Sequence, residues 1–365
     1  YMLDKYIKKV QEAGYTGVVY VQDTGGSNPT RSKFGVFSPG TLFSVDSGEI
    51  TNNTSCIWIH QTRKTVLNKE GNIIIGMSNI DNFTGKSTFY EITVENIHNP
   101  TTYDEVERFI STYNPSETII ISNMPDNKIN DIINYAKIES KKIHTLTYLD
   151  SRVKNAEKQV YQHEILNKYF SNNVSESLYK SSLEFVYGIQ SYVYLLHFVF
   201  EHNPSLINKI HEPIIENNTE RLLLANHSLQ QLNIIDDHNY KGKLSSVSGF
   251  LNNCITSIGM RSFKNTILNP TTNIVNLERN YDITEYLLKT EQWKSWRIQL
   301  KNIKDIEKLN RQIYMKKITP FHLFSFYENL STIQNLFTSV DNDECLQTHF
   351  KPDISLNISL ICDKF

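Results

Sequence analysis

The sequence has 365 residues, enough for two or three domains with their own hydrophobic cores, and a formal net charge of −2. Nucleic-acid-binding proteins are often basic, and this chain is not, so any binding to DNA would have to come from local basic patches. The most apolar stretch, residues 192–200, is too short to cross a bilayer, so we expect no membrane segment. The four cysteines form no C-x-x-C pair, so we expect no metal site and free thiols in a reducing compartment.

The first fifty residues predict a helix followed by two strands. An apolar period over residues 3–13, closed by Gly14, is typical of a helix with a glycine C-cap. β-Favouring residues predict strands over residues 15–22 and 33–37. The second strand runs into Ser38–Thr41, a turn in which proline pre-sets φ and glycine follows it.

Arg31 and Lys33 form the basic pair nearest the second of these strands. Lysine and arginine contacts to DNA go mainly to the phosphates, where they position the protein without reading sequence. The pair is therefore a candidate DNA contact. The alternative is an ordinary solvated loop edge.

From about residue 54 the pattern alternates between strands and helices. Such alternation predicts a small α/β domain with a partly parallel sheet. The expected strands cover residues 55–60, 72–80, 87–94, 117–122 and 142–146, and the expected helices cover residues 101–113 and 127–136.

Two features of this region could suggest an enzyme. Gly85-Lys86-Ser87-Thr88 looks like the end of a phosphate-binding loop, but the earlier glycine is missing and an alternating strand follows where a helix is needed. Asp81 and Glu91 flank the same hairpin, but the strand before it carries no acid for a two-metal nuclease site. A stand-alone nucleotide-hydrolysing or nuclease enzyme therefore stays only as an alternative.

From residue 151 onwards the pattern is helical, with no convincing strand ladder. Apolar residues recur at spacings of three and four, which is typical of helices that pack on one face. The expected helices cover residues 156–170, 183–202, 276–288, 293–313 and 317–335.

The stretch 221–270 holds the most informative order of residues. A turn with Gly242 precedes a helical stretch from Val247 to Ile258, which we expect Gly259 and Arg261 to interrupt. Asn269-Pro270 ends it, because a residue before proline is pushed out of the helical region.

This order resembles the core domain of the MutS family of DNA mismatch repair proteins. Cys254 and Ile258 stand where the family usually has threonine and methionine. The positions that match the first core pattern are Leu229, Leu232, Gly242, Leu251, Asn252, Thr256, Gly259, Arg261 and Pro270. A second core pattern is met by Leu300, Ile303, Asp305, Ile306, Glu307, Leu309, Ile313, Pro320, Leu323 and Leu330.

The resemblance extends towards the start of the chain and implies three domains. Residues 1–50 resemble the end of the mismatch-recognition domain, carried by Ala13-Gly14-Tyr15 and Ser38–Thr41. Residues 51–150 would form the connector, an α/β domain whose fold is like ribonuclease H. Residues 151–365 would form the helical core with its levers.

The resemblance also implies a function for the longer protein of which this sequence would be an internal fragment. That protein would bind double-stranded DNA with mismatches, act as a homodimer and hydrolyse ATP with Mg²⁺, using an ATPase outside this chain. The Phe-x-Glu pair that probes the mismatch would precede Tyr1. Within the family the match is closest to the form encoded in octocoral mitochondrial genomes, which implies a mitochondrial location. The segment itself shows no catalytic set, and a helical scaffold that binds only protein is a further alternative.

Overall fold

The computed structural model describes residues 2–22, 30–43, 49–63, 71–96, 100–207, 210–216, 221–222, 227–235 and 242–349. The chain divides into two compact units, which are described separately. Unit 1 comprises residues 1–217 and 225–228, and unit 2 comprises residues 218–224 and 229–365.

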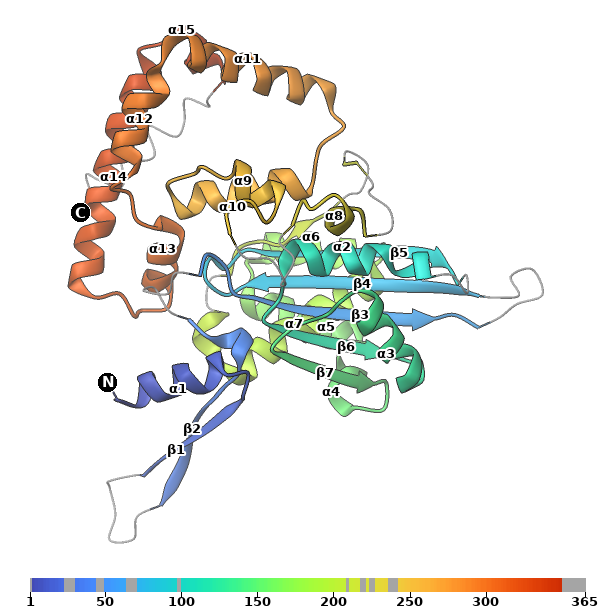
Figure 1. The fold of residues 1–365 in the computed structure, drawn as a ribbon. Coiled ribbons are helices and arrows are strands. Elements are labelled where there is room, and N and C mark those ends of the chain that lie inside the picture. Colours follow the sequence, from blue (N-terminus) through green and yellow to red (C-terminus); the bar gives the residue numbers. More distant parts are fainter. Residues whose placement is uncertain are drawn as a thin grey trace. The chain divides into compact units, whose positions relative to one another are not determined.

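Unit 1 begins with a helix and a β-hairpin, drawn in blue in Figure 1. Helix α1 (Met2–Glu12) ends before Gly14, whose φ of +85° confirms the predicted glycine C-cap. Strands β1 (Gly17–Gln22) and β2 (Arg31–Phe37) pair antiparallel, and the short 3-10 helix η1 (Pro39–Thr41) follows. The expected strand-to-turn order of this segment is therefore confirmed.

A six-stranded sheet in the order β7-β6-β3-β4-β5-β8 forms the centre of unit 1 (Figure 1). Its strands are β3 (Asn53–Gln61), β4 (Asn72–Asp81), β5 (Ser87–Glu95), β6 (Glu117–Ser122), β7 (Lys142–Thr147) and β8 (Ile214–Ile215). Strands β3, β6 and β7 run parallel, and β4 lies antiparallel between β3 and β5. The predicted partly parallel sheet is confirmed.

Strand β8 shows that the expectation of no strand after residue 150 was wrong. Ile214 and Ile215 pair in parallel with Thr88 and Phe89 at the edge of the sheet. Two apolar residues are too few to show the alternation by which a strand is recognised in a sequence.

Helices cover both faces of this sheet because alternate residues of each strand point to opposite sides. Ile57 and Ile59 of β3 join a buried cluster with α2 (Asp104–Tyr113) and α3 (Asp126–Tyr135). Cys56 and Trp58, also fully buried, face the opposite side, where α7 packs against β3 and β4. The 3-10 helix η2 (Pro100–Tyr103) precedes α2.

Helix α7 (Val186–His202) approaches the sheet very closely at Gly76 of β4. A Cβ atom at Gly76 would overlap the carbonyl group of Tyr187 and lie 2.5 Å from the amide nitrogen of Gly188. The Glu91 carboxylate accepts hydrogen bonds from these two amides, at 2.6 and 3.0 Å. Burial raises the pKa of Glu91, and the two amide donors partly oppose that shift.

Four further elements complete unit 1 around α7. They are α4 (Ser151–Ala156), α5 (Gln159–Tyr169), α6 (Asn172–Ser182) and the 3-10 helix η3 (Pro204–Leu206). The helix expected over residues 156–170 is confirmed as α5, and α4 is a further helix before it. The expected domain boundary at residue 150 falls inside unit 1, because the apolar helix α7 packs on the sheet.

Unit 2 is helical in its described residues. Its helices are α8 (Ser228–Gln231, which begins at the unit boundary), α9 (Val247–Leu251), α10 (Ser257–Leu268), α11 (Ile274–Thr290), α12 (Gln292–Leu300), α13 (Ile306–Tyr314), α14 (Pro320–Asp341) and α15 (Glu344–His349). No described helix of the chain is long and apolar enough to span a membrane.

Two long helices predicted in this region are each broken into two. The stretch 247–258 breaks before Thr256, whose hydroxyl accepts the amide of Gly259 and caps α10, so Gly259 and Arg261 lie inside a helix that they were expected to interrupt. The stretch 293–313 breaks at 301–305, where Asp305 caps α13. The apolar spacing continues through both breaks, but the capping side chains of Thr256 and Asp305 start a new helix after each one.

Candidate functional site

The turn after β2 is locked into the sheet of unit 1 by buried side-chain amides. The Asn52 amide nitrogen lies 2.8–3.2 Å from three carbonyl oxygens of residues 39–42. The Asn82 amide donates to the Gly40 carbonyl at 2.6 Å, and Gln11 of α1 donates to the Ser38 carbonyl at 2.6 Å. The hairpin and α1 are therefore tied to the sheet by directional hydrogen bonds.

Glu117 completes this junction from the first position of β6. Its carboxylate is fully buried and accepts the Gly40 amide at 2.9 Å, while its other oxygen lies 2.7 Å from Nε2 of His144 on β7. A Cβ atom at Gly40 would lie 2.8 Å from Glu117 Oε2, so only glycine allows this approach. We call residues 38–42 with Asn52, Asn82 and Glu117 the hairpin junction.

Arg31 and Lys33 both lie on β2, beyond this junction. Both side chains are exposed, and residues two apart on a strand point to the same face. They pair with Gln22 and Tyr20 of β1. The two cations are thus available together to a phosphate backbone, and their contact with DNA stays a prediction.

The Gly85-Lys86 segment is the turn of the β4–β5 hairpin. The Asp81 carboxylate organises it by accepting the Phe83 amide at 3.1 Å and the Thr84 hydroxyl at 2.7 Å. Gly85 has a φ of +77° and donates its amide to the Asp81 carbonyl. With Asp81 engaged in the turn and Glu91 capping α7, neither acid is free for phosphate or metal chemistry.

The two core patterns meet at Arg261. Its guanidinium donates two parallel hydrogen bonds of 2.7 Å to the Asp305 carboxylate and a third of 2.5 Å to Glu307. These side chains are 11, 12 and 23 % exposed. Burial alone would lower the pKa of Arg261, but the two carboxylates raise it above its ordinary value. We call these three residues the Arg261 cluster.

The Arg261 cluster joins helix α10 to the start of α13. Asp305 Oδ1 also accepts the Lys308 amide at 3.3 Å, so one carboxylate both caps α13 and binds α10. The sequence placed Arg261 in one pattern and Asp305 and Glu307 in another, and periodicity could not predict that they pair.

Several other residues of the two patterns lie in turns or at helix ends. Gly242, with a φ of +141°, lies in the turn before α9, whereas residues 236–241 of that turn lie outside the described part of the chain. Leu251 ends α9 and Pro320 is the first residue of α14. Pro270 follows α10, and its carbonyl accepts the Leu222 amide at 2.8 Å.

Polar contacts also fix α12 within unit 2, and sequence reasoning missed them. Arg297 donates to the Asn253 carbonyl in the α9–α10 break at 2.9 Å. Trp296 donates its indole N–H to Ser339 of α14 at 3.0 Å. Because each contact joins residues more than forty positions apart, helical spacing carries no signal for it.

Asp343 forms a second charged centre, between α14 and α15. It accepts the Tyr286 hydroxyl at 2.7 Å, the Gln292 amide at 3.1 Å and the Cys345 amide at 3.0 Å. The hydrogen bond to Asp343 raises the pKa of Tyr286 to about 12, and the same bond lowers the pKa of Asp343. Asp343 therefore connects the end of α11, the start of α12 and the cap of α15.

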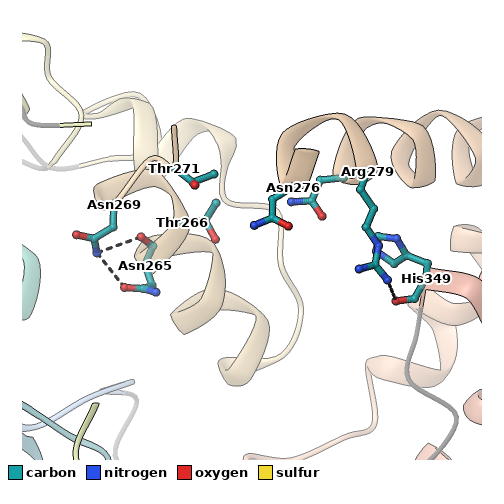
Figure 2. Close-up of a pocket in the computed structure, with 8 residues that line it drawn as sticks. Asn265, Thr266, Asn269, Thr271, Asn276, Arg279 and His349 are labelled. Carbon is teal, nitrogen blue, oxygen red and sulfur yellow. Dashed lines mark hydrogen bonds between the residues drawn. The ribbon is translucent and has the colours of Figure 1, made fainter. Parts of the chain in front are cut away.

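A hollow of about 440 Å³ lies beside α10, α11 and α15, and Figure 2 shows its lining. Arg279 donates to the carbonyls of Thr348 and His349 at the end of α15, and Asn269 bonds Asn265. The lining side chains carry no carboxylate that could act as a base: Asn265, Thr266, Asn269, Thr271, Asn276, Arg279, Asn280 and His349. The position of Arg279 in this hollow is explained by its hydrogen bonds to the last carbonyls of α15.

Within the described residues, no group of three or more histidine, cysteine, aspartate or glutamate side chains is placed to hold a metal ion. The directional contacts of the described chain concentrate instead at the hairpin junction, the Arg261 cluster and Asp343.

Comparisons with known proteins agree with this description. Residues 227–364 match the family model described as MutS domain III. A putative DNA mismatch repair protein mutS homolog of Acanthamoeba polyphaga mimivirus is 28 % identical over 368 residues, covering 93 % of this chain and 33 % of the relative.

Two further relatives carry similar names. The DNA mismatch repair protein MutS of Caldanaerobacter subterraneus is 23 % identical over 373 residues, covering 99 % of this chain and 39 % of the relative. The mitochondrial DNA mismatch repair protein mutS homolog of Sarcophyton glaucum is 30 % identical over 156 residues, covering 42 % of this chain and 15 % of the relative. The chain therefore spans 33 to 39 % of the length of the first two relatives.

Proposed function

Because the chain belongs to the MutS family, we propose that it is the transmitting part of a DNA mismatch repair protein. Its role is to couple binding of mismatched double-stranded DNA to ATP, and the groups that probe the mismatch and hydrolyse ATP lie outside this chain. Coupling of this kind needs elements with fixed geometry between two sites. The observation that carries the proposal is the Arg261 cluster, which fixes two helices inside the region matching MutS domain III.

The parts of the structure suit the domains that such a protein needs. We assign the hairpin of β1 and β2 to the end of the mismatch-recognition domain and the six-stranded sheet to a ribonuclease-H-like connector. The strand order of the sheet, with β4 antiparallel beside β3, supports the connector assignment. Unit 2 corresponds to the helical core with its levers. The hairpin junction then lies where the first two domains join.

The proposal extends to the partners of the longer protein. It acts as a homodimer, binds ATP with Mg²⁺ and hydrolyses the ATP in a DNA-dependent manner. A mitochondrial location is supported by the name of the Sarcophyton glaucum relative. Fractionation of the source cells tests the location, and light scattering at working concentration tests the dimer.

Arg31 and Lys33 are proposed to contact the DNA backbone. Removing one phosphate contact weakens binding to all sequences alike and lowers the slope of log affinity against log salt by about 1. Arg31→Ala and Lys33→Ala in the full-length protein are therefore expected to lower affinity equally for mismatched and paired duplexes. An unchanged salt slope in both variants would mean that the pair is only a solvated edge.

The experiment for the main proposal uses the full-length protein and two duplexes that differ by one mismatch. Affinity is measured for each duplex at fixed salt, with and without ATP. Preference for the mismatch that ATP weakens or converts to sliding supports the proposal. Equal binding to both duplexes without an ATP effect contradicts it. A protein that bound neither duplex would favour a scaffold that binds only protein.

A further inference from the structure

The last described segment of unit 1 before the chain enters unit 2 is held at the edge of the sheet. Strand β8 pairs with β5, and the Glu216 amide donates to the Phe89 carbonyl at 3.3 Å. The Glu216 carboxylate accepts a hydrogen bond from the Tyr113 hydroxyl, and a guanidinium nitrogen of Arg108 lies 3.4 Å from its other oxygen. The start of the segment is held separately: His211 donates its amide to the Gly85 carbonyl at 3.0 Å, and its carbonyl accepts the Ser87 hydroxyl at 3.3 Å. The β8 pairing and the Glu216 carboxylate hold its end.

Arg108 of α2 is built into this contact. Its side chain is only 4 % exposed, and its guanidinium also donates to the Tyr90 hydroxyl at 2.9 Å and to Glu105 at 3.1 Å. Burial would lower the pKa of Arg108, but the surrounding oxygen atoms raise it. A buried cation that needs carboxylate partners makes the site specific for an acid such as Glu216.

The chain returns to unit 1 at residues 225–228, and the neighbouring residue of α2 receives it. Nδ1 of His227 lies 3.7 Å from Oε1 of Glu107, whose side chain is 5 % exposed. The His227 ring also packs on Tyr135 of α3, with ring centres 4.7 Å apart. The adjacent residues Glu107 and Arg108 thus hold the two points at which this connection touches unit 1.

Between these two points the chain belongs to unit 2. Leu222 and Arg221 pair with Pro270 and Thr271, directly after helix α10, which carries Arg261. Along the chain, only a few residues separate Arg221 and Leu222 from Glu216 before them and from His227 after them.

We propose that helix α2 is a two-point anchor for the connection between the units, and that release of Glu216 from Arg108 and Tyr113 is the step that loosens it. Release would loosen residues 212–216 beyond the His211 contacts, which at about 3.3 Å per extended residue add up to about 16 Å of reach. This inference goes beyond the proposed function and does not depend on mismatch recognition.

Hydrogen–deuterium exchange of the full-length protein tests the anchor. Glu216→Gln removes the charge but keeps an acceptor, and Glu216→Ala removes both. Losing hydrogen bonds to charged groups is expected to speed exchange in residues 212–216 by about tenfold for glutamine and by more for alanine. Exchange in β3 and β4 stays unchanged. Glu212→Gln, an exposed acid of the same segment, is the matched control and should behave as the wild type.

The second anchor point is tested in the same way. His227→Ala is expected to speed exchange in residues 227–231, whereas His163→Ala should not speed exchange in its own helix. His163 is a matched control because it also makes one polar and one ring contact, to Asn167 and Tyr179.

Two results would overturn the proposal. One is unchanged exchange in residues 212–216 of both Glu216 variants. The other is an equal loss of protection in β3 and β4, which would make Glu216 an ordinary part of the fold. Both readouts are independent of DNA and ATP, so they stand even if the mismatch-repair proposal fails.

Discussion

Replacing Arg261 by alanine should destabilise the contact between α10 and α13. The change removes three hydrogen bonds between charged groups, each worth about 1.5–3 kcal/mol when its partners are desolvated. It also leaves two neighbouring carboxylates without their cation, and breaking a buried ion pair in this way costs about 3–5 kcal/mol. The side chains are 11, 12 and 23 % exposed, so water compensates part of this loss. We expect a local destabilisation of about 3 kcal/mol.

Native-state hydrogen exchange in the full-length protein measures this effect directly. A loss of about 3 kcal/mol corresponds to roughly a hundredfold faster exchange of the amides of α10 and α13. Arg261→Lys keeps the charge but cannot form the parallel pair of bonds, so it should lie between the wild type and alanine. Arg297→Ala removes a single exposed hydrogen bond from the same unit and should cost less than about 1 kcal/mol. If Arg261→Ala cost no more than Arg297→Ala, the cluster would not fix the two helices.

Three further predictions concern other parts of the chain. Gly76→Ala should destabilise unit 1 by about 3 kcal/mol in denaturant unfolding, because the new methyl group displaces Tyr187 and with it α7. The contact of Tyr286 with Asp343 has two pH limits. The stability that the contact contributes declines as pH rises from 10 through the raised tyrosine pKa of about 12, where the phenol loses its proton, and it declines in acid as pH falls below 3.8 through the lowered pKa of Asp343. Phenolate absorbance, compared between the wild type and Tyr286→Phe, checks the upper limit. Lys86→Ala should leave ATP affinity unchanged, because the residue lies in a hairpin turn.

Each of these predictions has a result that would contradict it. Gly17→Ala is the control for Gly76, since its new methyl group would meet only Val10 at an ordinary 3.5 Å, and equal unfolding of both variants would remove the packing argument. A Tyr286 phenol that titrates near pH 10 would mean that Asp343 does not accept its hydrogen bond. A loss of ATP binding in Lys86→Ala would restore the phosphate-loop alternative.

The sheet of unit 1 could be predicted because its strands carry their own signal. Residues 117–122 contain three consecutive β-branched isoleucines, Ile119–Ile121, between polar segments, and the structure places β6 at these bounds. Helix α7 carries no comparable signal of what it packs against, because it is apolar along most of its length. Such a helix could lie in a bundle or on a sheet, and only the close approach at Gly76 decides between them.

The helical breaks show a different limit. Val247 to Ile258 and Trp293 to Ile313 keep their apolar spacing through the breaks, so periodicity alone predicts continuous helices. The caps were present in the sequence as Thr256 and Asp305, three residues before the amides they accept. A search for capping residues inside a long apolar period would have found both.

The candidate sites depend on contacts that local sequence cannot predict. Arg261 and Asp305 are 44 positions apart, and Gly40 and Glu117 are 77 apart. The resemblance to MutS drew attention to Arg261, Asp305 and Glu307 one by one, but only the structure pairs them. Asn52, Asn82 and Glu117 belonged to no pattern and were missed entirely.

The central claim is that the Arg261 cluster transmits between DNA and ATP. The most direct test measures mismatch affinity of the full-length protein with and without ATP for the wild type, Arg261→Ala and Arg297→Ala. Our account predicts that Arg261→Ala keeps binding to DNA and to ATP but loses most of the ATP-induced change in mismatch affinity, whereas Arg297→Ala retains it. An ATP effect in Arg261→Ala equal to that of the wild type would contradict the account.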